Sequence, residues 1–265
     1  MSLANQIAAN LPFLRRYARA LSGSQAAGDA FVRAMLEALV ADADLMASLG
    51  DGRVPLYRAF TKVWASAQLA DAPVAGMTIS EHEAGAQLRL GTITPPARQA
   101  LLLTTLEDFT TAEAAAIMGL DADTITALVS AAVAEIEAEQ KTSVLIIEDE
   151  PLIAMQLEDL VAGLGHAICG TAATRTQARE VAAEQLPGLV LADIQLADGS
   201  SGLDAVDDIL GFGSVPVIFI TAYPERLLTG DRPEPTYLVT KPFQEATVRA
   251  AISQALFFQS SKPLG

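Results

Sequence analysis

The sequence predicts a multidomain fold, in which an all-α helical domain at residues 1–140 is followed by a doubly wound α/β domain at residues 141–265. Two observations support this division. Up to Gln140, apolar residues recur three and four positions apart, as in helices with one buried face. After Lys141, short apolar runs alternate with helical segments, which is typical of parallel strands joined by crossover helices.

The helical domain divides into two groups of helices. Apolar spacing such as Phe31, Met35 and Leu39 predicts helices near residues 3–21, 24–48, 55–70, 96–106, 111–118 and 122–139. The stretch at 71–94 contains Gly, Pro and Thr and has weak periodicity, so we expect a linker there. The predicted parts are therefore 1–70, the linker 71–94, and 95–140.

The second domain is predicted from five apolar runs. They lie at residues 144–147, 167–170, 188–192, 215–220 and 237–239, with helical segments such as 152–164 between them. Strands that are apolar throughout are covered by helices on both faces, so the five runs predict one parallel sheet of a doubly wound domain.

Composition limits the classes of function. No apolar run approaches the roughly 18 residues of a membrane span, and Met1–Leu14 lacks a basic segment followed by an apolar one, so we expect a cytoplasmic protein without a membrane segment. The net charge of −15 divides into −7 for residues 1–140 and −8 for residues 141–265. Because such surfaces repel phosphate backbones, a basic protein is a better expected partner than nucleic acid.

Polar residues follow the predicted strands where each one ends. Glu148 and Asp149 follow the first strand, Asp193 the third, Thr221 ends the fourth, and Lys241 follows the fifth. The carboxyl ends of parallel strands meet at one edge of a sheet, where reactive sites form. One acid at such a position is usually a solvated loop residue, but five consistently placed residues predict a Mg²⁺ site, with Asp193 as the best placed nucleophile for a phosphoryl group.

Residues 142–260 resemble the receiver domain of two-component response regulators, a flavodoxin-like fold. The matching motifs are Val144-Leu-Ile-Ile-Glu-Asp-Glu150, Leu191-Ala-Asp-Ile194, Ile220-Thr221 and Thr240-Lys241-Pro242-Phe243. The resemblance implies that Glu148, Asp149, Asp193 and the backbone carbonyl of Gln195 bind the metal. It also implies that Asp193 is the phosphoacceptor, and that Thr221 and Lys241 sense the phosphate.

The predicted switch residues depart from the common receiver pattern. The aromatic residue usual three positions before the lysine is replaced by Leu238. Phe219-Ile-Thr-Ala-Tyr223 instead resembles a receiver subgroup with a Phe-Ala-Thr-Gly-Tyr-like segment, which implies a switch role for Tyr223. The resemblance also implies a cis peptide bond before Pro242, which we include in the switch.

The helical domain resembles extracytoplasmic-function sigma factors. Residues 94–139 are similar to region 4, with a helix-turn-helix that turns at Gly119, and residues 10–70 are more weakly similar to region 2. The segments that carry the similarity are Thr94–Leu101, Thr111–Leu120, Asp123–Ser130, Leu11–Tyr17, Asp29–Val32 and Pro55–Phe60. A helical bundle with no relation to sigma factors is the simpler alternative.

The expected recognition helix lacks the cations that DNA binding requires. No Lys or Arg occurs from Gln99 to Gln140, whereas eight acids do. Phosphate contacts from Lys and Arg supply most of the nonspecific affinity for DNA, so we expect no direct DNA binding. Leu128 and Val129 on this helix belong either to the core or to a surface that binds a protein partner.

A sigma-like domain followed by a receiver resembles the PhyR-type anti-anti-sigma regulators of the bacterial general stress response. The resemblance implies that the unphosphorylated receiver packs against the sigma-like domain, and that phosphorylation releases this domain to sequester an anti-sigma factor of the NepR type. A sensor histidine kinase would donate the phosphoryl group. The chain would not be an enzyme apart from its own phosphorylation and dephosphorylation. The alternatives are a transcription regulator that binds DNA directly and a phosphatase.

Overall fold

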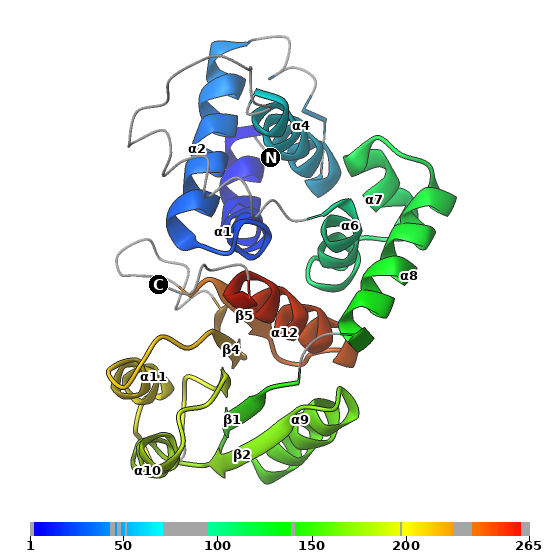
Figure 1. Ribbon diagram of the computed structural model, residues 1–265. Coiled ribbons are helices and arrows are strands. Elements are labelled where there is room, and N and C mark those ends of the chain that lie inside the picture. The colour runs from blue at the N-terminus through cyan, green and yellow to red at the C-terminus, as the bar shows by residue number, and fades with distance from the viewer. Residues whose placement is uncertain are drawn as a thin grey trace, which may run out of the picture. The chain divides into compact units, whose positions relative to one another are not determined.

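The computed structural model describes residues 3–42, 46, 49–50, 52–70, 95–138, 141–196, 198–224 and 235–260. The chain forms two compact units, Met1–Ala132 and Val133–Gly265. The predicted linker at 71–94 lies outside the described residues. Figure 1 shows a helical unit followed along the chain by a unit built on a sheet.

The helical unit contains the predicted helices. They are α1 (Leu3–Ser22), α2 (Gln25–Ala41), α4 (Arg53–Ala70), α6 (Pro96–Thr105), α7 (Thr111–Met118) and α8 (Ala122–Ala138), which continues past the boundary at Ala132. The helix predicted at 24–48 ends earlier, since Asp42 has an extended backbone. The Thr110 side chain accepts a hydrogen bond from the amide of Glu113, and Gly119 ends α7 in a left-handed conformation, so sequence signals set both ends of this short helix.

Aromatic side chains fill the core of the helical unit. The ring of Tyr17 lies 5.5 Å from that of Tyr57 and 5.9 Å from that of Phe60, measured between centroids. Helices α1 and α2 approach closely at Gly28, where an added β-carbon would lie 2.6 Å from the amide nitrogen of Arg19. Glycine at position 28 therefore allows the two helices to pack backbone against backbone.

The second unit is the predicted doubly wound α/β fold. Its strands are β1 (Ser143–Ile147), β2 (Ala167–Ala172), β3 (Leu189–Ala192), β4 (Val217–Thr221) and β5 (Tyr237–Thr240). All pairs are parallel and the order is β2-β1-β3-β4-β5. Its helices are α9 (Pro151–Gly163), α10 (Arg175–Glu184), α11 (Gly202–Leu210) and α12 (Glu245–Ser260). Figure 1 shows α9 and α12 on one side of the sheet and α10 and α11 on the other.

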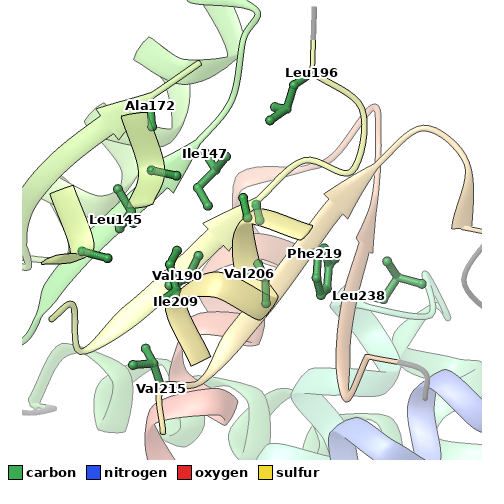
Figure 2. Packing of buried hydrophobic residues seen from close by; sticks show 14 residues of the cluster. Leu145, Ile147, Ala172, Val190, Leu196, Val206, Ile209, Val215, Phe219 and Leu238 are labelled. Carbon is green, nitrogen blue, oxygen red and sulfur yellow. The ribbon is translucent and has the colours of Figure 1, made fainter. Parts of the chain in front are cut away.

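The central strands are buried on both faces, as their apolar sequences predict. Every residue of β3 is buried, and in β1 only Ser143 is partly exposed. Figure 2 shows the cluster on one face, where Ile147, Val190, Phe219 and Leu238 pack with residues of the helices. The strand predicted at 215–220 begins at Val217, because Pro216 has no amide hydrogen to donate to a ladder.

Among the described residues, no single helix has the length and apolar composition of a membrane span. The two helical segments Thr111–Met118 and Ala122–Ile136 reach this length and apolar composition only when they are taken together. The chain bends by 100° between them.

Candidate functional site

Three carboxylates gather at the carboxyl edge of the sheet. Ile147 of β1 lies opposite Ala192 of β3, so the residues that follow these two strands emerge side by side. As a result Glu148, Asp149 and Asp193 each offer a carboxylate oxygen, and these atoms lie within 4.8 Å of one another. Glu148 and Asp193 are buried, and Asp149 is partly exposed.

Lys241 joins two of these acids. Its Nζ lies 2.7 Å from Oε2 of Glu148 and 2.7 Å from Oδ2 of Asp193. The lysine follows β5, and its backbone amide donates to the carbonyl of Thr221 at the end of β4, so the sheet itself positions the ammonium group. The site therefore brings three carboxyl groups together, and two of them are paired with the Lys241 ammonium group.

Burial and charge shift the pKa values of the cluster. Burial raises the pKa of Glu148, and the nearby charge of Asp193 adds to this, although Lys241 opposes both effects. Burial by itself would lower the pKa of Lys241, but hydrogen bonds from its amine to Asp193 and Glu148 outweigh burial and raise it. The lysine is thus held charged between the two acids.

The donor set suits a hard divalent cation. All three acids offer carboxylate oxygens, and they follow two adjacent strands that are paired in the sheet. Mg²⁺ prefers such oxygens together with water and phosphate oxygens. The cluster can therefore accept a cation, and a phosphate group would complete its coordination.

The loop after Asp193 is closed by backbone hydrogen bonds. The Asp193 carboxylate accepts from the amides of Ile194 (2.5 Å) and Gln195 (3.4 Å). Gln195 pairs with Ser201 in an isolated antiparallel bridge, and the amide of Gly202 donates to the carbonyl of Ile194. These bonds fix the backbone at Gln195, whose carbonyl was predicted as a metal ligand.

The predicted sensing and switch residues lie around the same edge. Thr221 ends β4 and is buried, and its Oγ1 accepts a hydrogen bond from the amide of Tyr223 at 3.1 Å. Tyr223 is 43% exposed. The peptide bond between Lys241 and Pro242 is cis, as the receiver resemblance implied. Leu238, at the position of the usual switch aromatic, is buried in the sheet.

The helix-turn-helix consists of α7, a turn at Gly119, and α8. Asp121 accepts hydrogen bonds from the amide and hydroxyl of Thr124, so it caps α8. Leu128 and Val129 are partly buried, so part of each residue remains exposed. The exposed positions of α8 include Thr126 and Ser130, and also Val133, which is 44% exposed.

Two acids, Glu150 and Glu107, have contacts that local sequence patterns do not indicate. Glu150 lies 3.9 Å from Lys241 Nζ and adds a fourth acid beside the cluster. Glu107 is one of the eight acids between Gln99 and Gln140, yet its side chain is fully buried against two arginines. No local pattern indicates this, because those arginines are 91 and 54 positions away in the sequence.

Family models match three parts of the chain. They are the sigma2 domain of PhyR at residues 7–61, the sigma-like domain of the response regulator PhyR at residues 90–139, and the response regulator receiver domain at residues 144–253. The two sigma-like matches precede the receiver match along the chain, which is the order that the sequence resemblances predict.

Known proteins match nearly the whole chain. The phyllosphere-induced regulator PhyR of Methylorubrum extorquens is 54% identical over 98% of this chain and 97% of its own length. A crystal structure of the anti-anti-sigma factor PhyR from Bartonella quintana is 48% identical, with a TM-score of 0.84 over 98% of this chain and 97% of that one. The Bartonella quintana protein has also been crystallised in complex with the anti-sigma factor NepR (50% identity, 97% and 100% coverage, TM-score 0.41).

The domain order, the matched family models and the full-length similarity agree with one another, and they agree with the acidic cluster found at the edge of the sheet. The chain therefore belongs to the PhyR family of anti-anti-sigma response regulators.

Proposed function

We propose that this chain releases a sigma factor when Asp193 becomes phosphorylated. The phosphorylated chain would bind an anti-sigma factor of the NepR type through its helical domain, and the sigma factor held by that anti-sigma factor would be freed. The observation that carries this proposal is the cluster of Glu148, Asp149, Asp193 and Lys241, which stands in one chain with a sigma-like domain.

The phosphoryl group would come from a phosphohistidine of a sensor kinase. An oxygen of Asp193 would form the new bond to phosphorus while the bond between phosphorus and the histidine nitrogen breaks. The backbone amides of Ile194 and Gln195 hold Oδ1 of Asp193, while Oδ2 faces Lys241. Lys241 would then stabilise negative charge on the transferred group, and the Thr221 hydroxyl would donate to a phosphate oxygen.

Mg²⁺ is the cation that we propose for the acidic cluster. Glu148, Asp149, Asp193 and the backbone carbonyl of Gln195 would hold it. When bound, Mg²⁺ would neutralise charge on the oxygens of the transferred phosphoryl group. We propose that Tyr223 and Pro242 act as switch residues. The Tyr223 amide donates a hydrogen bond to the Thr221 hydroxyl, and Pro242 follows Lys241 directly.

The partner follows from the relatives. The Bartonella quintana anti-anti-sigma factor binds NepR, and this chain is similar to that protein over 98% of its length. The partly buried Leu128 and Val129 on α8 are the residues that we propose for contact with the partner.

We further propose the functional boundaries 1–140 and 141–265, with 71–94 as the linker between the two sigma-like parts.

A labelling experiment tests the chemistry. The full-length chain is treated with acetyl phosphate and Mg²⁺, and covalent phosphate is measured by mass spectrometry. Asp193→Ala should lose the label, whereas Asp204→Ala, which changes an exposed acid on α11, should keep it. Label that persists in Asp193→Ala would place the phosphoacceptor elsewhere.

A further inference from the structure

The buried carboxylate of Glu107 lies in the segment that connects α6 and α7 of the helical unit. The side chain of Glu107 has no exposed surface. Its Oε1 accepts from Nε and Nη2 of Arg16 at 3.0 and 2.9 Å. Its Oε2 accepts from Nη2 of Arg53 at 3.0 Å and from the hydroxyl of Tyr57 at 2.7 Å. Both oxygens of this carboxylate are therefore satisfied twice, which is what a buried charge requires.

The partners of Glu107 come from the other sigma-like half of the domain. Arg16 lies on α1, and Arg53 and Tyr57 lie on α4, all within the segment matched at residues 7–61. Glu107 lies within the segment matched at residues 90–139. Arg16 also donates to the carbonyl of Leu106, and Arg53 to that of Glu107 itself. The cluster thus connects two segments that separate family models describe.

The backbone around Glu107 is shaped to make these contacts. Asp108 has a φ of 53°, and it is the only non-glycine residue with positive φ in the part of the chain that the structure describes. Such a conformation persists only where the surroundings hold it. The next residue, Phe109, packs its ring 4.8 Å from that of Tyr57 and 4.5 Å from the guanidinium of Arg53. The turn therefore directs both Glu107 and Phe109 against the first half.

We propose that Glu107 is a positioning residue for the partner surface, because it holds the two sigma-like halves in one arrangement before a partner binds. This inference rests on the proposed function. A partner that contacts both halves binds with an apparent affinity that is proportional to the fraction of molecules in which the halves are already correctly placed. A loss of the cluster should lower that fraction and weaken the affinity, although no residue of the cluster needs to touch the partner.

Two variants and one matched control test this role in the full-length chain. Glu107→Gln keeps the shape of the side chain and removes its charge. Arg53→Gln is the milder change, because the Arg53 side chain is 37% exposed, and it serves if Glu107→Gln fails to fold. Arg15→Gln removes an ion pair with Asp29 that lies entirely between α1 and α2, within the first half. It controls for the loss of a comparable charge pair.

Binding and hydrogen exchange are measured separately. With purified NepR of Bartonella quintana as the probe, Arg53→Gln should raise the Kd of the phosphorylated chain about tenfold, which corresponds to a correctly placed fraction of about one tenth. Arg15→Gln should change the Kd less than about twofold. Amides of α6 and α7 should exchange faster in Arg53→Gln and Glu107→Gln without partner, and all variants should accept phosphate at the wild-type rate.

The outcomes separate this inference from the proposed function. If the variants exchange as wild type does, the cluster does not join the halves. If exchange rises but Kd stays the same, the arrangement does not matter to the partner, and the positioning role is wrong. If the wild-type protein does not bind the probe, the proposed function is contradicted. The positioning role depends on that binding, so it would be contradicted as well. The exchange data would still decide whether Glu107 joins the halves.

Discussion

Gly202 lies so close to Asp193 that an added β-carbon would stand 1.7 Å from the Asp193 carbonyl oxygen. It would also lie 2.8 Å from the carbonyl carbon of the same residue. Both contacts are with backbone, which cannot rotate away as a flexible side chain could. The start of α11 and the proposed phosphoacceptor are therefore in direct contact, and only glycine leaves room for it.

Gly202→Ala should displace the backbone of Asp193 and slow phosphorylation. We expect a loss of roughly 1–3 kcal/mol in the free energy of unfolding, the usual cost of overpacking. We also expect a labelling rate from acetyl phosphate at least about tenfold lower, because misplacing a reacting group raises its barrier. Stopped reactions analysed by mass spectrometry, with thermal denaturation in parallel, measure both quantities.

Gly199→Ala is the control for this substitution. Gly199 lies in the same loop with a φ of 78°, and an added β-carbon would meet nothing within 4 Å. The change should cost about 1 kcal/mol of backbone strain while the labelling rate of the folded protein stays near that of wild type. Equal slowing in both variants would show that general loop strain, rather than contact with Asp193, is responsible.

Lys241→Met should increase the affinity for Mg²⁺. Without the ammonium group, Glu148 and Asp193 face each other unneutralised, and a divalent cation would replace the missing charge. The melting temperature of this variant should therefore rise more on addition of Mg²⁺ than that of wild type. The control is Lys141→Met, which removes a lysine that donates to the carbonyl of Leu164. A smaller Mg²⁺ effect in Lys241→Met than in wild type would mean that the lysine supports cation binding.

Asp29 should make the stability of the helical unit depend on pH. Burial by itself would raise the pKa of Asp29, but hydrogen bonds and charge from Arg19 and Arg15 outweigh it and lower the pKa. A carboxyl group whose pKa is lower in the folded state contributes stability above its unfolded pKa of about 3.9 and loses it as pH falls through the lower folded pKa. The contribution should be about 1 kcal/mol or less, since the group is partly solvated.

Urea denaturation from pH 2 to pH 6 measures this contribution. Asp29→Asn should flatten the dependence of the unfolding free energy on pH in the acidic part of that range. Asp123→Asn, at an exposed position on α8, controls for the loss of one carboxylate from the helical domain. A profile that is the same for Asp29→Asn and wild type would contradict the assignment.

Lysine residues introduced on α8 should give the chain affinity for DNA if the helical domain has the shape of a sigma factor. Thr126, Ser130 and Ala134 are exposed on α8, four residues apart. We expect wild type to give no retarded band with duplex DNA at moderate salt. The triple substitution to lysine should give a band that weakens steeply as salt increases, because phosphate contacts release counterions. Salt-dependent retardation by wild type would favour the alternative of direct DNA binding.

The sequence predicts most of the fold because the informative patterns are local. The continuous apolar runs that end in Glu148 and Asp193 predict buried parallel strands, and parallel strands bring their carboxyl ends together. The acids at one sheet edge could therefore be predicted without a structure. A strand boundary differs from the prediction where local chemistry intervenes, as at Pro216, which delays the start of β4.

Contacts between residues that lie far apart in the sequence could not be predicted. Glu107 is an ordinary acid in the sequence, and its partners Arg16 and Arg53 lie in other helices. Gly202 likewise follows an unremarkable Gly/Ser stretch, and only the folded loop shows how closely it approaches Asp193. Both features arise from the tertiary fold, which a single sequence does not reveal.

The most direct test of the account is the affinity of the full-length chain for a NepR-type anti-sigma factor, measured by calorimetry with and without acetyl phosphate and Mg²⁺. We expect phosphorylation to tighten binding at least about tenfold, a shift of about 1.4 kcal/mol, and Asp193→Ala to show no response. Equal affinity in both states, or a response that survives in Asp193→Ala, would contradict the account.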